Sequence, residues 1–188
     1  MLSRGRGLAD TNHGVSLRRT KTLFNVMKPF TEARLTSAAY AERRSPDSAT
    51  GLTVVVTSVA SDSHTWNLVY LQLALEELGH KVVNLGACVP DELLISECLR
   101  VRPDLVVVST VNGHGFHDGM QLIGRLRARE DLATTPVVIG GKLGIAGPAG
   151  RAGRDQLHAA GFDAVFEEGG GIAALATLAG QLRVSDQT

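Results

Sequence analysis

Five short apolar runs, each followed by a stretch with apolar residues at helical spacing, limit the folds open to this chain. The runs are rich in valine, and they predict strands at residues 53–59, 81–85, 105–109, 136–139 and 164–166. The stretches that follow them predict helices at residues 68–78, 90–101, 119–129, 155–160 and 172–182. Strands that alternate with helices in this way form a parallel sheet covered by helices on both faces.

The connections narrow the topology further. A crossover between parallel strands is almost always right-handed, and few strand orders satisfy this rule with short loops. We therefore predict an α/β fold of the flavodoxin-like type, with five parallel strands in the order 2-1-3-4-5. Gly79 is expected just beyond the end of the first helix, and Asp118 is expected to cap the start of the third.

The chain changes character near Gly51. Residues 1–50 are polar and lean toward basic, and we expect an N-terminal arm that is flexible or docks on a partner. A weak helical pattern runs through residues 30–44 of this arm, with Thr31 as its N-cap. Residues 51–183 are predicted to form the globular domain, and residues 184–188 a tail.

Charge and composition exclude several classes of function. The 19 Lys and Arg residues balance the 19 Asp and Glu residues, so overall charge favours neither nucleic acid nor an anionic membrane. No stretch has the apolar length of a membrane span, and the first residues lack the apolar run of a secretory signal. Cys88 and Cys98 fit no disulfide or metal framework, so we expect two thiols and a cytoplasmic protein.

A histidine follows an aspartate in the loop after the first strand, which reads Ser61-Asp62-Ser63-His64. In sheets of this type, ligands bind beyond the carboxyl ends of the strands. A carboxylate placed two residues from a histidine can hold one ring nitrogen while the other faces outward to a metal. The same pair could also form a general acid–base dyad, or Asp62 or Ser63 could simply cap the next helix. The spacing alone leaves these three interpretations open.

Two further loops carry small residues directly after strands. Ser109 ends the third strand, and Gly140 and Gly141 end the fourth, where glycine permits a close approach to the backbone. With the His64 loop they outline a long space between the sheet and the helices. We call this space, between Ser109, the paired glycines and the His64 loop, the tail slot, because it suits a ligand with an extended tail.

These three motifs together resemble the signature of cobalamin-binding domains that hold the cofactor base-off and histidine-on. The resemblance implies that His64 replaces the cofactor's own dimethylbenzimidazole as the lower axial ligand of cobalt, with Asp62 as its hydrogen-bonding partner. It also implies that Ser109 contacts the displaced base and that Gly140 and Gly141 make room for the nucleotide tail. The remaining residues expected to line the same site are Ser61, Ser63, Thr65, Asn67, Thr110, Val111, Lys142 and Leu143.

The chain departs from the signature at two positions. Asn67 stands three residues after the histidine, where the signature usually has glycine. Val111 stands two residues after the serine, where the signature usually has leucine. Valine keeps the apolar contact, and asparagine adopts left-handed backbone more readily than most residues, so it keeps part of the glycine's role.

Among the families that use this domain, the chain is most similar to the small subunit of glutamate (methylaspartate) mutase. The similarity lies in the segments SDSH, HKVVNLGACVPDELL and GFDAVFEEG. It implies adenosylcobalamin as the cofactor and a large TIM-barrel partner subunit that binds most of the substrate. It also implies one subunit of an isomerase that is inactive without this partner.

Other functions stay open at this point. They are the small subunit of another carbon-skeleton mutase, a cobalamin carrier or sensor that acts through protein contacts, and the corrinoid protein of a methyltransferase. A receiver-like signalling domain would need an acidic pair after the first strand and an aspartate at the end of the third. The chain has Ser58-Val59 and Ser109 at these places.

Overall fold

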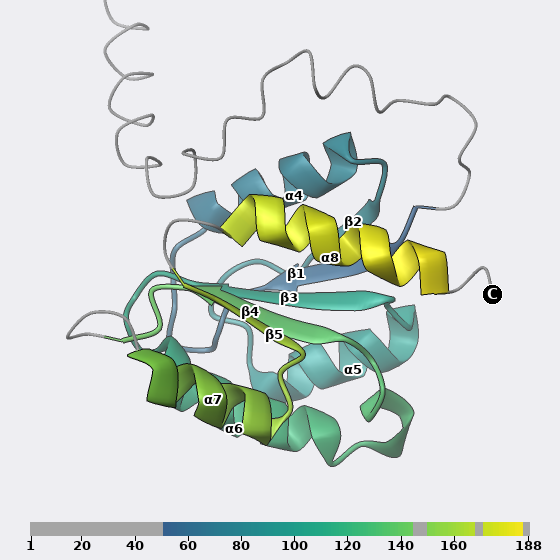
Figure 1. Cartoon of the computed structure of the whole chain (residues 1–188). Coiled ribbons are helices and arrows are strands. Elements are labelled where there is room, and N and C mark those ends of the chain that lie inside the picture. The colour runs from purple at the N-terminus through teal and green to yellow at the C-terminus, as the bar shows by residue number, and fades with distance from the viewer. Residues whose placement is uncertain (1–50, 145–149, 168–170, 186–188) are drawn as a thin grey trace, which may run out of the picture.

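The computed structural model describes residues 51–144, 150–167 and 171–185, and these contain a five-stranded parallel sheet (Figure 1). Its strands are β1 (Thr53–Thr57), β2 (Lys81–Asn84), β3 (Leu105–Thr110), β4 (Val137–Gly141) and β5 (Ala164–Glu167). Their order is β2-β1-β3-β4-β5, and every neighbouring pair is parallel. The predicted fold class and strand order are confirmed. The predicted arm at residues 1–50, with its helix, lies outside the described residues.

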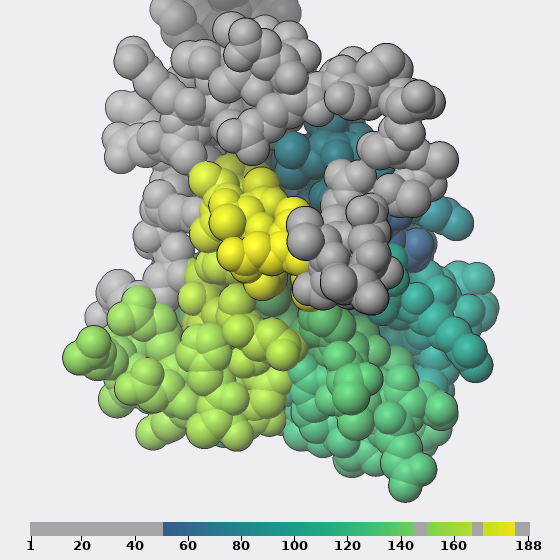
Figure 2. Space-filling view, turned by 45° about the vertical axis from the view of Figure 1, so that its right-hand side comes forward, coloured from purple at the N-terminus to yellow at the C-terminus, as the bar shows by residue number. Residues whose placement is uncertain are grey.

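Helices cover both faces of this sheet. On one face lie α4 (Trp66–Glu77) and α8 (Gly171–Ser185); on the other lie α5 (Asp91–Val101), α6 (Gly115–Arg127) and α7 (Gly150–Ala160) (Figure 1). A 3₁₀ turn (Glu130–Leu132) joins α6 to β4. The space-filling view shows α8 in yellow on one side of the molecule and the green α6 and α7 on the other (Figure 2).

The strands build a separate apolar core on each face because their side chains alternate between the two. Val54, Val56 and Val107 pack with α4 and α8. Val55 and Val106 pack with α5, α6 and α7. Burial of the sheet on both faces explains why its strands read as continuous valine-rich runs.

Some strands and helices begin or end at other residues than predicted, because tertiary contacts determine these ends. Strand β1 ends at Thr57, two residues early, because the chain turns there and the Asp62 N–H donates to the Val59 carbonyl at 3.0 Å. Helix α6 begins at Gly115, four residues before the predicted start. Asp118 therefore lies in the first turn of α6, and the prediction that it caps this helix is wrong.

The start of α6 depends on close packing at Gly115. A Cβ atom at this position would lie 2.3 Å from Cγ2 of Thr110 and 3.0 Å from Cδ2 of Leu143. Only a glycine lets the first turn approach β3 and the end of β4 so closely. Helix α7 also starts early, at Gly150 instead of residue 155.

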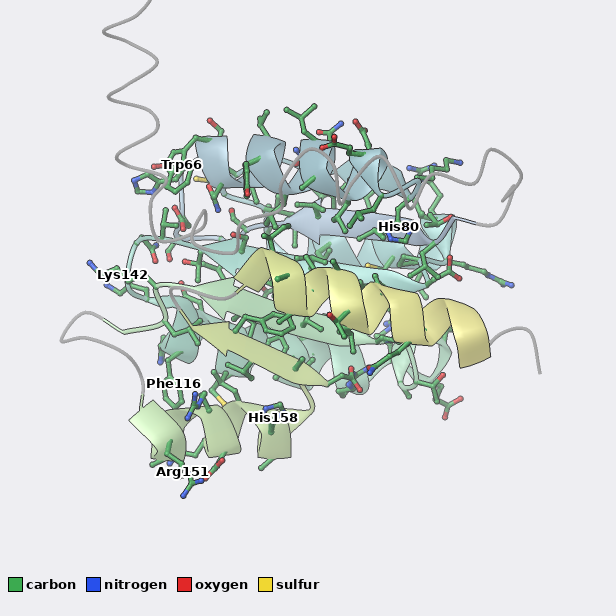
Figure 3. All side chains as sticks on the ribbon, turned by 45° about the horizontal axis from the view of Figure 1, so that its top comes forward. Trp66, His80, Phe116, Lys142, Arg151 and His158 are labelled. Carbon is green, nitrogen blue, oxygen red and sulfur yellow. The ribbon has the colours of Figure 1, made fainter. Side chains whose placement is uncertain are left out.

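The opposite end of the sheet is held by a buried histidine. His80 follows Gly79, which has the positive φ of 86° expected just beyond a helix end. Its Nδ1 accepts a hydrogen bond from the Leu52 N–H at 3.2 Å. His80 lies at the amino edge of the sheet, whereas Trp66 and Lys142 lie at the carboxyl edge (Figure 3).

Candidate cofactor-binding site

The three loops singled out in the sequence meet at the carboxyl edge of the sheet. Strand β1 pairs with β3 up to Thr57 and Val108, and β3 pairs with β4 up to Thr110 and Gly141. Parallel strands end at the same edge, so the residues that follow β1, β3 and β4 become neighbours. The side chains of Trp66, the first residue of α4, and of Lys142, which follows β4, both project at this edge (Figure 3).

Asp62 is fully buried at the centre of this edge, and its carboxylate is saturated with hydrogen bonds. Oδ1 accepts from the His64 N–H at 3.0 Å and lies 2.7 Å from Nδ1 of the same histidine. Oδ2 accepts from the Thr110 hydroxyl at 2.9 Å and from the Val111 N–H at 2.6 Å. The carboxylate thus ties the loop after β1 to the end of β3.

These hydrogen bonds also set the charge of Asp62. Burial raises the pKa of its carboxyl, because it disfavours the charged form. The backbone N–H groups of His64 and Val111, with the side chains of His64 and Thr110, stabilise the charged form and outweigh burial. The pKa of Asp62 is therefore lowered, and the group is ionised at neutral pH.

The ionised carboxylate determines how His64 presents its ring. A carboxylate only accepts hydrogen bonds, so the proton of a neutral imidazole resides on Nδ1, which faces Asp62. The other nitrogen, Nε2, then carries a lone pair. Since the side chain of His64 is 48% exposed, this lone pair is available to a metal ion outside the fold.

Of the three interpretations of this loop, the helix cap is wrong. The N-cap of α4 is Thr65, and no side chain makes a capping hydrogen bond there. Asp62 directs both of its carboxylate oxygens at His64 and the end of β3 instead. The geometry is that of an oriented imidazole.

The backbone of Asp62 is hydrogen-bonded to the rest of the fold, as its side chain is. The Asp62 carbonyl accepts hydrogen bonds from the Cys88 N–H at 2.8 Å and from the Ser58 hydroxyl at 3.0 Å. Ser58 is buried, and its oxygen also accepts from the Cys88 N–H at 3.2 Å. His64 therefore projects from a loop that is fixed on both sides.

A second group of contacts, which the sequence did not predict, supports Ser61. Its hydroxyl bonds to the carboxylate of Asp118, and Nδ2 of Asn112 donates to Ser61 Oγ at 2.9 Å. No local signal marks these partners, because they lie more than 50 residues away in the sequence. Ser61 also lines a cavity of about 290 Å³ between α5 and α6, together with Ala60, Pro90, Asp91, Asp118, Gln121 and Arg125.

Asn67 and Ser109 meet inside the predicted tail slot. Both are buried, and Asn67 Nδ2 donates to Ser109 Oγ at 2.8 Å, which joins the first turn of α4 to the end of β3. Asn67 Oδ1 is buried without a hydrogen-bond partner, which holds for no other buried side-chain nitrogen or oxygen in the described residues. An unpaired buried acceptor costs about 1–3 kcal/mol, so a hydrogen-bond donor placed at this oxygen would be stabilising.

The paired glycines lie where the sequence placed them. Gly141 has a φ of 104°, and a Cβ atom there would lie 2.1 Å from the Thr110 carbonyl oxygen. At Gly140 a Cβ atom would lie 3.1 Å from Phe166. In the fold itself, these glycines allow β4 to approach β3 and β5 closely; room for a nucleotide tail stays a prediction.

The other predicted residues divide by exposure. Ser63, Thr65 and Lys142 are exposed at the rim of the site. Leu143 and Thr110 are buried beneath, and Val111 is half-buried. The structure therefore brings all the predicted residues to one edge, where some polar side chains are exposed and others, such as Asp62 and Thr110, are buried.

Comparison with known proteins agrees with this arrangement. Residues 52–176 match the family model described as the B12 binding domain. The chain belongs to this family. The B12-binding domain thus spans all five strands and the first part of α8.

Relatives of known name support a cobalamin-binding small subunit. The glutamate mutase sigma subunit of Halobacterium salinarum is 34% identical over 128 residues, which cover 68% of this chain and 85% of that protein. The glutamate mutase sigma subunit of Fusobacterium nucleatum is 29% identical over 117 residues, 62% of this chain and 85% of that protein. Among solved structures, a cobalamin-binding protein from Desulfitobacterium hafniense has the same fold, with a TM-score of 0.57 and 20% identity. That match covers 71% of this chain and 60% of that protein.

Two further observations bear on the class of protein. The residues after β1 and at the end of β3 that would bear the acids of a receiver domain are Ser58, Val59 and Ser109, all buried. Within the part of the chain that the structure describes, no helix is both long and apolar enough to cross a bilayer.

Proposed function

We propose that this chain is the small subunit of an adenosylcobalamin-dependent carbon-skeleton mutase of the glutamate mutase type, and that His64 is its lower axial ligand to cobalt. The observation that carries the proposal is the Asp62–His64 pair, in which a buried, ionised carboxylate leaves Nε2 of an exposed imidazole free. Membership of the B12-binding domain family and the named sigma-subunit relatives support it.

The residues present fit the cofactor. A corrinoid whose own base is displaced takes a nitrogen ligand from the protein, and His64 Nε2 offers one at the rim of the site. A released nucleotide tail needs a polar partner inside the fold, and the unpaired Asn67 Oδ1 beside Ser109 offers one. When bound, adenosylcobalamin supplies a carbon radical by homolysis of its cobalt–carbon bond.

The residues of this chain bind the cofactor and orient its cobalt ligand. Asp62 holds the imidazole in one tautomer and one direction, which raises its basicity toward a metal. Ser109 and Asn67 hold the nucleotide tail, and the exposed Ser63, Thr65 and Lys142 contact the cofactor at the rim. No residue of the chain is assigned to substrate chemistry, so the substrate would be bound by the partner.

That partner, in this proposal, is a large subunit with a TIM barrel, and the cofactor lies between the two chains. The chain alone is then inactive, and both subunits work in the cytoplasm. Residues 51–183 form the cofactor-binding unit of this assembly, and residues 1–50 an arm that is flexible or docks on a partner.

The axial ligand is tested directly by electron paramagnetic resonance of the bound cobalt(II) form. Protein made with ¹⁴N-histidine should split the cobalt signal into triplets, and protein with ¹⁵N-histidine should split it into doublets. A triplet in both samples would mean that the cofactor's own base remains the ligand, and the proposal would fail.

The assignment as a mutase subunit needs a second measurement. The chain is mixed with a glutamate mutase large subunit and adenosylcobalamin, and isomerisation of glutamate is followed. Activity that requires both chains supports the proposal. Tight cofactor binding with no activity in the mixture would favour a carrier or sensor instead.

A further inference from the structure

The departure from the family signature at position 67 places a hydrogen-bonding group inside the tail slot. Asn67 is 1% exposed, and its amide has two ends with different roles. Nδ2 donates to Ser109 Oγ at 2.8 Å, whereas Oδ1 is buried with no partner. A glycine at this position would offer neither group.

The hydrogen bond from Asn67 also orients Ser109. Because Ser109 Oγ accepts from Asn67 Nδ2, its own O–H is left to donate elsewhere. The two side chains together present one donor, the Ser109 O–H, and one acceptor, Asn67 Oδ1. They thus form a small recognition surface at the junction of α4 and β3.

Lower bases of cobamides differ in what they offer to such a surface. Released dimethylbenzimidazole has a ring nitrogen that accepts a hydrogen bond, but it has two methyl groups and no N–H donor. Adenine has ring nitrogens that accept and an exocyclic amino group that donates. Both bases can accept a hydrogen bond from the Ser109 hydroxyl, but only adenine can also donate one to Asn67 Oδ1.

We propose that Asn67 selects the lower base of the cofactor and favours a base with an N–H donor, such as adenine, over dimethylbenzimidazole. The inference rests on the proposed function, because it takes the tail slot to be the site of the displaced base. A buried polar group left unpaired penalises the ligand that lacks its partner, which is how a site rejects a close analogue. Asn67 is accordingly a specificity-determining residue.

The test compares two cofactors in wild type and variants. The purified full chain is titrated with methylcobalamin and with its adenine-base analogue, and each Kd is taken from the visible spectrum. Because the two bases also differ in their intrinsic bond to cobalt, the measured quantity is the ratio of the two Kd values, compared between proteins. This comparison cancels the intrinsic difference.

Asn67→Gly restores the residue usual in the signature, and Asn67→Leu keeps the volume but removes both polar groups. We expect the preference for the adenine base to fall about fivefold to tenfold in both, the effect of one neutral hydrogen bond. Gln72→Ala is the matched control, since Gln72 is another amide on α4 that bonds to Glu76 and Asn84, away from the slot. It should leave the ratio unchanged.

Several results would overturn the inference. They are an unchanged ratio in both Asn67 variants, a preference that moves toward adenine in them, or an equal loss in Gln72→Ala. Cobinamide, which has no nucleotide tail, separates this failure from failure of the proposed function. If cobinamide binds wild type through His64 but the ratio does not move, only the role of Asn67 is wrong. If cobinamide shows no histidine ligation, the axial assignment itself is wrong and the inference falls with it.

Discussion

Nδ1 of His64 lies 2.7 Å from a carboxylate oxygen of Asp62, and the two side chains differ completely in exposure. Asp62 is buried, whereas the side chain of His64 is 48% exposed. The negative charge of Asp62 therefore lies inside the fold, where hydrogen bonds stabilise it, and the imidazole of His64 lies at the surface. This separation lets a short loop orient a metal ligand without placing the metal in the core.

Replacing His64 with alanine should abolish axial ligation. The loop backbone keeps its hydrogen bonds to Cys88 and Ser58, so the protein should fold normally. The spectrum of cobalamin mixed with this variant should be that of the free cofactor. His117→Ala, an exposed histidine in the first turn of α6, serves as the control and should bind like wild type. A histidine-ligated spectrum in His64→Ala would refute the assignment.

Replacing Asp62 with asparagine should weaken ligation without ending it. The ligand remains, but an amide can turn its NH₂ toward His64 and no longer fixes the proton on Nδ1. Loss of such an orienting partner lowers metal affinity about 10- to 100-fold. Titration with cobinamide measures this effect free of the tail. Asp104→Asn, which alters an exposed carboxylate bonded to the Thr53 N–H, should show no change; equal weakening in both would point to a general loss of stability.

The folded state should also lose stability in acid through Asp62. Its pKa is lower in the folded protein than the value of about 3.9 in an unfolded chain. The stabilising contribution is therefore fully present above that unfolded value, and it is lost as the pH falls through the lower folded value. The difference in free energy of unfolding between wild type and Asp62→Asn should shrink from about pH 5 to about pH 2. A difference independent of pH would contradict the lowered pKa.

The fold followed from sequence because its signal is local and repeated. Most strands show as valine-rich runs, and the right-handed crossover rule then leaves few strand orders, of which 2-1-3-4-5 is a common one. The start of α6 was missed by four residues because it depends on Gly115 packing against Thr110 and Leu143. Contacts between segments that are distant in sequence leave no mark on local periodicity.

The site shows the same difference between contacts within a short segment and contacts between distant segments. His64 stands two positions after Asp62, so their hydrogen bond was among the interpretations that the spacing allowed. Asn67 and Ser109 are 42 residues apart, and position 67 stood out only as a departure from a signature. That its amide would bond to Ser109 and leave an oxygen unpaired required the packing of α4 on β3.

Gly141→Ala tests the close approach of β4 to β3. The new methyl group would lie 2.1 Å from the Thr110 carbonyl oxygen, at a φ of 104° that alanine avoids. We expect a loss of about 2–4 kcal/mol in the free energy of unfolding, measured in urea. Gly124→Ala is the control, because its Cβ meets nothing within 4 Å in the middle of α6. It should raise stability by about 0.5–1 kcal/mol. Equal effects at the two glycines would show that Gly141 is not constrained by β3.

The two thiols should react very differently. Cys98 is fully buried on the inner face of α5, and burial, with the nearby Glu97 carboxylate, raises its pKa to about 12. Cys88 is exposed. Since the thiolate is the reactive form, a thiol reagent at about pH 8 should label Cys88 alone in the native protein and both cysteines after unfolding in urea. Cys88→Ser should leave the native chain unlabelled. Rapid labelling of Cys98 in that variant would show that the core around α5 opens readily.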